Sequence, residues 1–173
     1  MKLFWLDLEM TGLEPQGDRI LEAAYIITDS SFKELETGEQ IVFQPPEILE
    51  KMNDWCQVHH RESGLLEKVP HGILEEELDQ KLEEAVQRYF SKEEPAYLAG
   101  NSIWQDRRFV ERWLPRFAQS LHYRMLDVST LKLIFQGMHG VSFPKSQKHR
   151  ALEDIRESIA EFQYYQSMIV VKR

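Results

Sequence analysis

The stretch Phe4-Trp5-Leu6-Asp7-Leu8-Glu9-Met10-Thr11-Gly12 sets two carboxylates into an otherwise apolar run. This alternation predicts a β-strand over residues 3–9, in which side chains two positions apart share a face. Asp7 and Glu9 therefore lie on one face, with Cα atoms roughly 7 Å apart, and Phe4, Leu6 and Leu8 point the other way, into a core. Neighbouring buried carboxylates repel each other unless a cation neutralises them, and Mg²⁺ or Mn²⁺ prefers such oxygen ligands. The alternative is a solvated strand end with two ordinary surface acids.

A second acidic position falls near the C-terminus, in His149-Arg150-Ala151-Leu152-Glu153-Asp154-Ile155. Apolar residues spaced three and four apart predict an amphipathic helix over residues 151–168, with Asp154 bordering its apolar stripe. His149 precedes this helix as a loop residue. A histidine beside a fixed carboxylate suits a general base. Taken singly, His149 is equally a surface histidine, and Asp154 a helix N-terminal acid favoured by the helix dipole.

A third segment is Gly100-Asn101-Ser102-Ile103-Trp104-Gln105-Asp106-Arg107-Arg108-Phe109. It follows a short apolar run at residues 97–99, which predicts a strand. The first three residues of the segment predict a turn that caps a following helix. Asp106 then lies about one turn into that helix. Alone, it reads as an N-terminal helix acid and nothing more.

Together the three segments resemble the DEDDh family of 3′→5′ exonucleases over nearly the whole chain. The resemblance rests on an ordered set of motifs: D-x-E at Asp7, N-x₄-D ending at Asp106 and H-x-A-x-x-D ending at Asp154. It extends to Leu126-Asp127-Val128-Ser129-Thr130. It implies an α/β chain with the ribonuclease H-like fold, a central mixed β-sheet flanked by helices, in a single exonuclease domain over residues 1–173.

The same resemblance implies phosphodiester hydrolysis with two metal ions. The residues that it assigns to catalysis are Asp7, Glu9, Asp106, Asp154 and His149. The four acids would bind two divalent cations, Mg²⁺ or Mn²⁺, which activate the attacking water and stabilise the leaving 3′-oxygen. His149 would accept the proton of that water.

Within the family, the members that act on very short RNA resemble the chain most. Their substrate-binding positions match Leu13, Trp55, His60, Ser102, Arg124 and Ser129. Leu13 would wedge against a base and Trp55 would stack on one, although Trp55 is equally a candidate core residue. The arginine and the two serines would cap a terminal 5′-phosphate, which implies dinucleotides and short RNA oligonucleotides as substrates. Trp104 departs from the family, where a small residue is expected.

His122 and Tyr123 match positions that reach across a twofold axis to substrate held by the partner, which implies a homodimer. Two large polar aromatic residues at the start of a short strand are not expected to be buried within one subunit. We expect the apolar centre of the interface at Trp104, Trp113 and Phe117. The alternative for these three is the subunit's own core.

Composition limits the remaining possibilities. The net charge of −8 argues against a protein that tracks long duplexes, since such proteins rely on many Lys and Arg contacts. A short nucleic acid held in a local pocket fits better. The single cysteine, Cys56, excludes an internal disulfide and fits the cytoplasm. The sequence contains no apolar run of ~18 residues, so no membrane span is expected.

Further strands and helices follow from periodicity and turn residues. Strands are predicted at 20–28, at 40–43 with a start as early as 32, and at 123–126; helices are predicted at 54–62, 74–90 and 129–135, and a loop at 137–148. Two other functions stay open: a proofreading-type 3′→5′ DNA exonuclease, and a catalytically silent nucleic-acid-binding module. A phosphate cap would halt a long strand and so disfavours the first, while a silent module has no need for His149.

Overall fold

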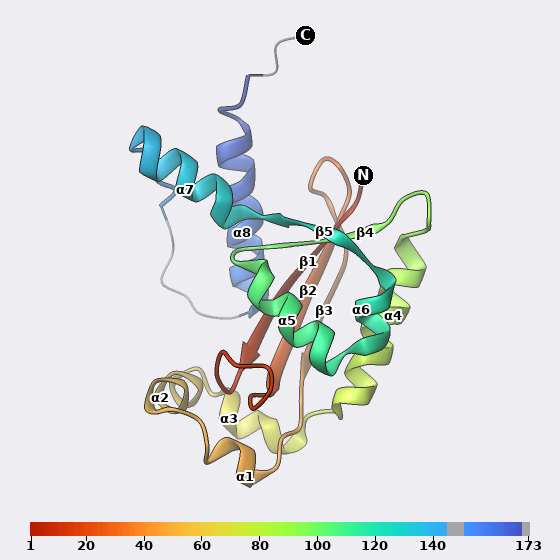
Figure 1. Cartoon of the computed structure of the whole chain (residues 1–173), viewed down its shortest axis with the longest axis vertical. Coiled ribbons are helices and arrows are strands. Elements are labelled where there is room, and N and C mark those ends of the chain that lie inside the picture. The colour runs from red at the N-terminus through yellow and green to blue at the C-terminus, as the bar shows by residue number, and fades with distance from the viewer. Residues whose placement is uncertain (145–150, 171–173) are drawn as a thin grey trace.

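In the computed structural model, which describes residues 1–144 and 151–170, the strands form one mixed β-sheet (Figure 1). The strands are β1 (Leu3–Met10), β2 (Ile20–Thr28), β3 (Glu34–Ile41), β4 (Ala96–Gly100) and β5 (Leu121–Asp127). Their order is β3-β2-β1-β4-β5, with β2 antiparallel to β1 and β3, and β4 parallel to β1 and β5. The predicted mixed sheet is confirmed, and β1 lies at its centre.

Helices cover both faces of this sheet (Figure 1). The long ones are α4 (Glu75–Tyr89), α5 (Ile103–Trp113), α7 (Val128–His139) and α8 (Ala151–Gln166), and α6 (Pro115–Ser120) is shorter. Phe4, Leu6 and Leu8 of β1 share one core cluster with buried residues of α4, α5 and α6. Leu3 and Trp5 share a second cluster with buried residues of α7 and α8 on the opposite face. The predicted alternation of β1 is therefore correct.

A third, smaller apolar cluster lies beneath a group of short helices. These are α1 (Pro46–Leu49), α2 (Asp54–Glu62), α3 (Leu65–Lys68) and the 3₁₀ helix η1 (Val69–His71). Cys56 of α2 packs in this cluster against Leu21 of β2, and its thiol is free. Asn53 caps α2 by accepting the backbone N–H of Cys56 at 2.9 Å, which is a typical N-cap bond. The group lies at the end of the sheet where β1 turns into β2 (Figure 1).

Several predicted boundaries were wrong: the strand predicted at 123–126 is β5, Leu121–Asp127, the helix predicted to residue 168 ends at Gln166, and β3 and α7 differ as well. β3 begins at Glu34 and ends at Ile41 rather than at residue 43, because Val42 leaves the sheet to form an isolated bridge with Ile73. α7 continues to His139, so the predicted loop begins later than residue 137. Gly137 stays inside the helix despite its poor propensity, and Gly140, in a left-handed conformation with φ of 67°, ends it.

Within the described residues, no helix is both long and apolar enough to cross a membrane.

Candidate active site

Three carboxylates meet at the end of β1. Ligand oxygens of Asp7, Glu9 and Asp154 all lie within 4.8 Å of one another, and all three side chains are partly buried. Asp7 and Glu9 share a face of β1, as their spacing predicts, and α8 packs across that face so that Asp154 in its first turn reaches both. The structure therefore brings together three of the four acids that the sequence singles out.

Asp106 adjoins this cluster from the first turn of α5. It is 7% exposed, and its Oδ1 accepts the backbone N–H of Leu8 at 3.0 Å, between the two β1 acids in the chain. The predicted position one turn into a helix is correct. Asp106 is not among the three residues whose ligand atoms lie within 4.8 Å of one another.

The acids strongly perturb one another. Burial, then the charges of Asp106, Glu9 and Asp154, raise the pKa of Asp7 well above its usual value. Burial is also the main cause that raises the pKa of Asp106 to about 7, although the Leu8 N–H opposes it. Such mutual repulsion is relieved by a cation that binds carboxylate oxygens. The donor set, all hard oxygen ligands, fits a divalent ion such as Mg²⁺ or Mn²⁺.

His149, the predicted general base, lies outside the described residues. Ala151, two positions later, is fully buried at the start of α8 and belongs to the cluster beneath that helix.

A pocket of about 510 Å³ opens beside the acids. It is lined by Glu9, Met10, Gly12, Leu13, Asn53, Trp55, Cys56 and His60. Trp55 is 69% exposed and stacks on His59, so it is not a core tryptophan. Leu13 is 66% exposed at the pocket's rim. Two predicted base-binding residues thus present their apolar surfaces to solvent at one pocket, next to a candidate metal ligand.

His60 joins the pocket to the acids. Its buried ring donates from Nε2 to the Met10 carbonyl at 2.8 Å, while Nδ1 lies 3.8 Å from Glu9 Oε2 without a hydrogen-bond partner among the described residues. Burial is the main cause that lowers the pKa of His60, which favours the neutral ring. In the neutral ring, with Nε2 donating to the Met10 carbonyl, Nδ1 carries a lone pair.

Hydrogen bonds hold the loop that carries Leu13 in place. Asp18 accepts the Thr11 hydroxyl at 3.0 Å and the Glu14 N–H at 2.8 Å. A Cβ at Gly12 would lie 2.4 Å from the Asp18 carboxylate, so a larger residue here would displace that carboxylate from its hydrogen bonds to Thr11 and Glu14. From α5, Gln105 Nε2 donates to the Leu13 carbonyl at 2.6 Å.

The predicted phosphate-binding serines lie together where β4 and β5 end. Ser102 Oγ is 3.2 Å from Ser129 Oγ, and the Ser102 N–H is shared between Ser129 Oγ and Asp127 Oδ1. The predicted helix cap was wrong in form. Ser102 occupies the N-cap position of α5, but its side chain makes no capping hydrogen bond to that helix. Ser102 instead adopts the left-handed conformation, with φ of 51°. Such strain in a residue other than glycine often marks a functional site.

The other predicted substrate and interface residues follow one another along β5. Tyr123 is 72% exposed and stacks on His122, and the Arg124 guanidinium lies over the Tyr123 ring. Tyr123 is therefore not buried within this chain, as the sequence analysis expects. β5 is an edge strand, so its outer side has no neighbouring strand in the sheet.

The expected apolar interface centre is wrong for one residue. Phe117 is fully buried in the subunit's own core, where its ring is tilted against that of Phe4 with the centroids 5.1 Å apart. Trp113 is partly buried against the same core, and Arg19 and Arg112 lie over its ring. Trp104 is 52% exposed, in the first turn of α5. An aromatic residue on a short helix can face either way, and the sequence does not distinguish the two.

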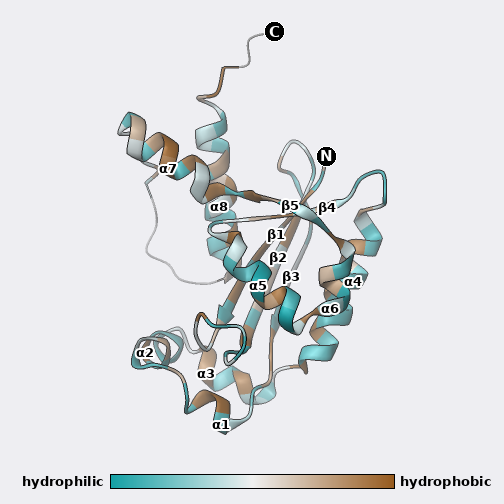
Figure 2. Ribbon diagram, in the orientation of Figure 1, coloured by the Kyte–Doolittle hydropathy of each residue, from teal (hydrophilic) through white to brown (hydrophobic). Residues whose placement is uncertain are grey.

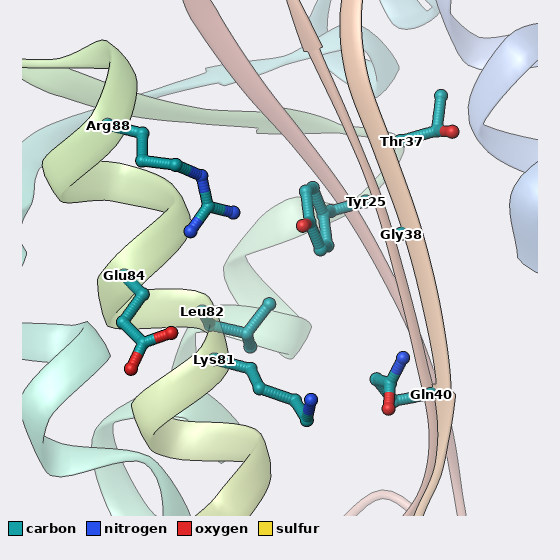
Figure 3. A pocket seen from close by; sticks show the side chains of 8 residues that line it. All are labelled: Tyr25, Thr37, Gly38, Gln40, Lys81, Leu82, Glu84 and Arg88. Carbon is teal, nitrogen blue, oxygen red and sulfur yellow. The ribbon is translucent and has the colours of Figure 1, made fainter.

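A second pocket, of about 340 Å³, lies on the other face between α4 and β3 (Figure 3). Arg88 is one of its two cationic residues, and its guanidinium is neutralised by Glu36, which also accepts the Tyr25 hydroxyl. The second is Lys81, and Glu84 of the same helix also lines the pocket. None of the residues that line it belongs to the carboxylate cluster.

Sequence reasoning missed Glu22, which faces Glu9 across the β1–β2 ladder. Burial, followed by the charge of Glu39, raises the pKa of Glu22 to about 7. A single acid within the apolar run of β2 was the signal for it. The analysis also missed Gln105 and Arg108, which hold the Leu13 loop.

The sequence profile of the exonuclease family matches residues 4–162. The chain therefore belongs to the exonuclease family. Within that family its curated relatives include oligoribonucleases. The oligoribonuclease of Francisella tularensis subsp. tularensis is 45% identical over 171 residues, covering 97% of this chain and 96% of the relative. That of Coxiella burnetii is 42% identical, covering 97% and 94%.

Solved structures with a similar fold are exonuclease I enzymes. A product-bound exonuclease I superposes with a TM-score of 0.72 at 15% identity, covering 96% of this chain and 43% of that one. The exonuclease I of Methylocaldum szegediense gives 0.65 at 18% identity, covering 93% and 40%. The chain thus spans less than half the length of these enzymes, and the likeness establishes the fold. The predicted ribonuclease H-like fold is confirmed.

Proposed function

We propose that the protein is a 3′→5′ exoribonuclease that degrades very short RNA, especially 5′-phosphorylated dinucleotides, to mononucleotides. The observation that carries this proposal is the cluster of Asp7, Glu9 and Asp154, adjoined by Asp106, in a chain 45% identical to an oligoribonuclease over nearly its full length. The mutually raised pKa values of the acids support a role in cation binding.

Asp7, Glu9, Asp106 and Asp154 would hold two divalent cations, Mg²⁺ or Mn²⁺. Bound cations would supply an activated water and neutralise the charge that develops at phosphorus and on the leaving oxygen. His149 would accept the water's proton, a role that rests on its place in the H-x-A-x-x-D motif.

The 510 Å³ pocket would hold the base at the 3′ end of the substrate. Trp55 offers an exposed aromatic face, and base–aromatic stacking contributes about 1–3 kcal/mol. Leu13 would press on the base from the pocket's rim. His60, which lines the same pocket, would contact the substrate there.

The opposite end of the substrate would be capped. Ser102, Ser129 and Arg124 would form the cap of the terminal 5′-phosphate, and the contact between the two serine hydroxyl groups supports a joint role. A cap at this end leaves no path for a longer strand, which favours short RNA over the long substrates of a proofreading enzyme.

A homodimer is part of the proposal. An exposed apolar surface follows the edge strand β5 into α7, where Leu133, Ile134 and Met138 are exposed (Figure 2). A second copy that covers this surface would bring its own Tyr123 to the neighbouring site. Leu133→Glu should then dissociate the dimer in sedimentation equilibrium, whereas Gln136→Glu, on the same helix, should not. A wild-type monomer at micromolar concentration would contradict this arrangement.

We place the enzyme in the cytoplasm, which the single free thiol of Cys56 supports.

One assay tests the function. Turnover of a 5′-phosphorylated RNA dinucleotide, a 20-residue RNA and a DNA dinucleotide is compared with Mg²⁺, with Mn²⁺ and with excess chelator. The RNA dinucleotide should be cleaved fastest, and chelator should abolish cleavage. Faster cleavage of the long strand would favour a processive exonuclease. Cleavage that persists in chelator would contradict the proposed metal site.

A further inference from the structure

A buried polar network connects α8 with the Ser102–Ser129 pair. Asn101, on the turn between β4 and α5, lies at its centre. Its Nδ2 donates to Ser158 Oγ at 2.8 Å and to Glu161 Oε2 at 3.1 Å, and its Oδ1 accepts the Ser129 hydroxyl at 3.2 Å. Ser158 and Glu161 are 7% and 1% exposed. The network therefore reaches from the interior to the surface where the two serines meet.

Glu161 decides the orientation of the Asn101 amide. A carboxylate offers only acceptors, so the Asn101 atom that faces it must be the amide nitrogen. The carbonyl oxygen of Asn101 then faces Ser129, and that oxygen can only accept. The single hydroxyl hydrogen of Ser129 is therefore directed at Asn101.

Ser129 consequently turns only lone pairs toward Ser102. Its Oγ accepts the Ser102 N–H at 2.9 Å, and Asp127 Oδ1 accepts the same N–H at 3.0 Å. These two acceptors stabilise the left-handed backbone of Ser102, which is unfavourable for a residue with a Cβ. The Ser102 hydroxyl keeps its hydrogen, which it directs at Ser129 Oγ or at a ligand.

We infer that Asn101 and Glu161 are positioning residues that fix the hydrogen-bond polarity of the Ser102–Ser129 pair, so that Ser102 donates to the substrate's 5′-phosphate and Ser129 holds Ser102. The inference rests on the proposed function, since it requires a terminal phosphate at this corner. It gives different roles to two serines that the sequence alone treats as equivalent.

Glu161→Gln tests the polarity without opening a cavity. A glutamine amide can also donate, so Asn101 can turn over and present Nδ2 to Ser129, and the fixed polarity is lost. Ser158→Ala is the matched control: it removes the other partner of the same amide nitrogen but leaves Glu161 to orient Asn101. A purely structural role would affect the two variants alike.

The readout is the ratio of kcat/KM for a 5′-phosphorylated RNA dinucleotide to kcat/KM for the same dinucleotide without that phosphate. The wild-type ratio should exceed one. Glu161→Gln should lower it by about tenfold, as expected for one charge-assisted hydrogen bond, mainly through KM of the phosphorylated substrate. Ser158→Ala should keep the wild-type ratio.

A second pair of variants addresses the serines directly and applies even if Glu161→Gln is too unstable to assay. Ser102→Ala removes the donor and should lower the ratio at least as far as Glu161→Gln does, to the part that Arg124 contributes, whereas Ser129→Ala leaves the donor in place and should retain more of the preference. The reverse order would overturn the inference.

The failures are distinguishable. An unchanged ratio in Glu161→Gln, or an equal loss in Ser158→Ala, overturns the inference and leaves the proposed function standing. A wild-type ratio of one would show that the enzyme does not recognise the 5′-phosphate. That result would overturn the inference as well. A wild-type protein that cleaves no dinucleotide contradicts the proposed function itself.

Discussion

The two faces of β1 differ in chemistry along a single strand. On one face Phe4, Leu6 and Leu8 are at most 5% exposed and belong to the larger apolar core. The other face begins with apolar residues and ends with Asp7 and Glu9, whose carboxylates repel each other and their neighbours. One face therefore stabilises the fold, and the end of the other has groups that cost stability until a cation binds. Substitutions on the two faces should separate stability from activity.

The largest effect is expected on the acidic face. Asp154→Asn removes one carboxylate from the cluster and should lower kcat by about 1000-fold or more, because metal charge stabilisation contributes several kcal/mol. The Tm of the metal-free protein should stay near the wild-type value, since a repelling charge has been lost. Steady-state kinetics and calorimetry measure the two quantities. Turnover within tenfold of wild type would exclude Asp154 from the site.

The apolar face should show the opposite pattern. Leu6→Ala should lower the free energy of unfolding by about 2–5 kcal/mol and leave kcat near wild type where the variant is folded. Leu13→Ala, the same change at an exposed position of the pocket, should alter stability by no more than about 0.5 kcal/mol and raise KM. Denaturant unfolding together with kinetics checks both. A large stability loss in Leu13→Ala would break the comparison.

The third effect concerns pH. In the metal-free protein the pKa of Asp106 is raised from 3.8 to about 7, and that of Asp7 is raised as well. A raised folded-state pKa adds stability that is fully present below the unfolded pKa and is lost as pH rises through the folded pKa. The metal-free Tm should therefore fall between pH 4 and pH 7, and Mg²⁺ should flatten the decline.

Asp106→Asn should remove part of the fall in the metal-free Tm with pH. Glu22, whose pKa is also about 7, should account for some of the fall that remains. Thermal melts at a series of pH values, with and without Mg²⁺, measure it. A metal-free Tm that is independent of pH across this window would contradict the argument.

Local patterns predicted the elements that carry the acids, because alternation in β1 and helical spacing in α8 are properties of neighbouring residues. β3 was harder to place, since an edge strand with mostly polar residues lacks that alternation. The hydrogen bond of His60 to Met10 spans 50 residues and that of Asn101 to Glu161 spans 60, so only the tertiary fold reveals them. The exposure of Trp55 could likewise not be predicted from the sequence, because an aromatic residue can lie on either face of an amphipathic helix.

The attachment of the Leu13 loop to α5 bears on attempts to re-engineer base preference. Gln105 and Arg108 donate to the Leu13 carbonyl, and Arg108 also pairs with Glu14. Asp106 lies between these two residues on the same helix. A loop transplanted from a relative would leave its α5 partners behind, and adjusting those partners would disturb the carboxylate that we propose as a metal ligand. The loop and the first two turns of α5 therefore form one exchangeable unit, and chimaeras should be cut outside both.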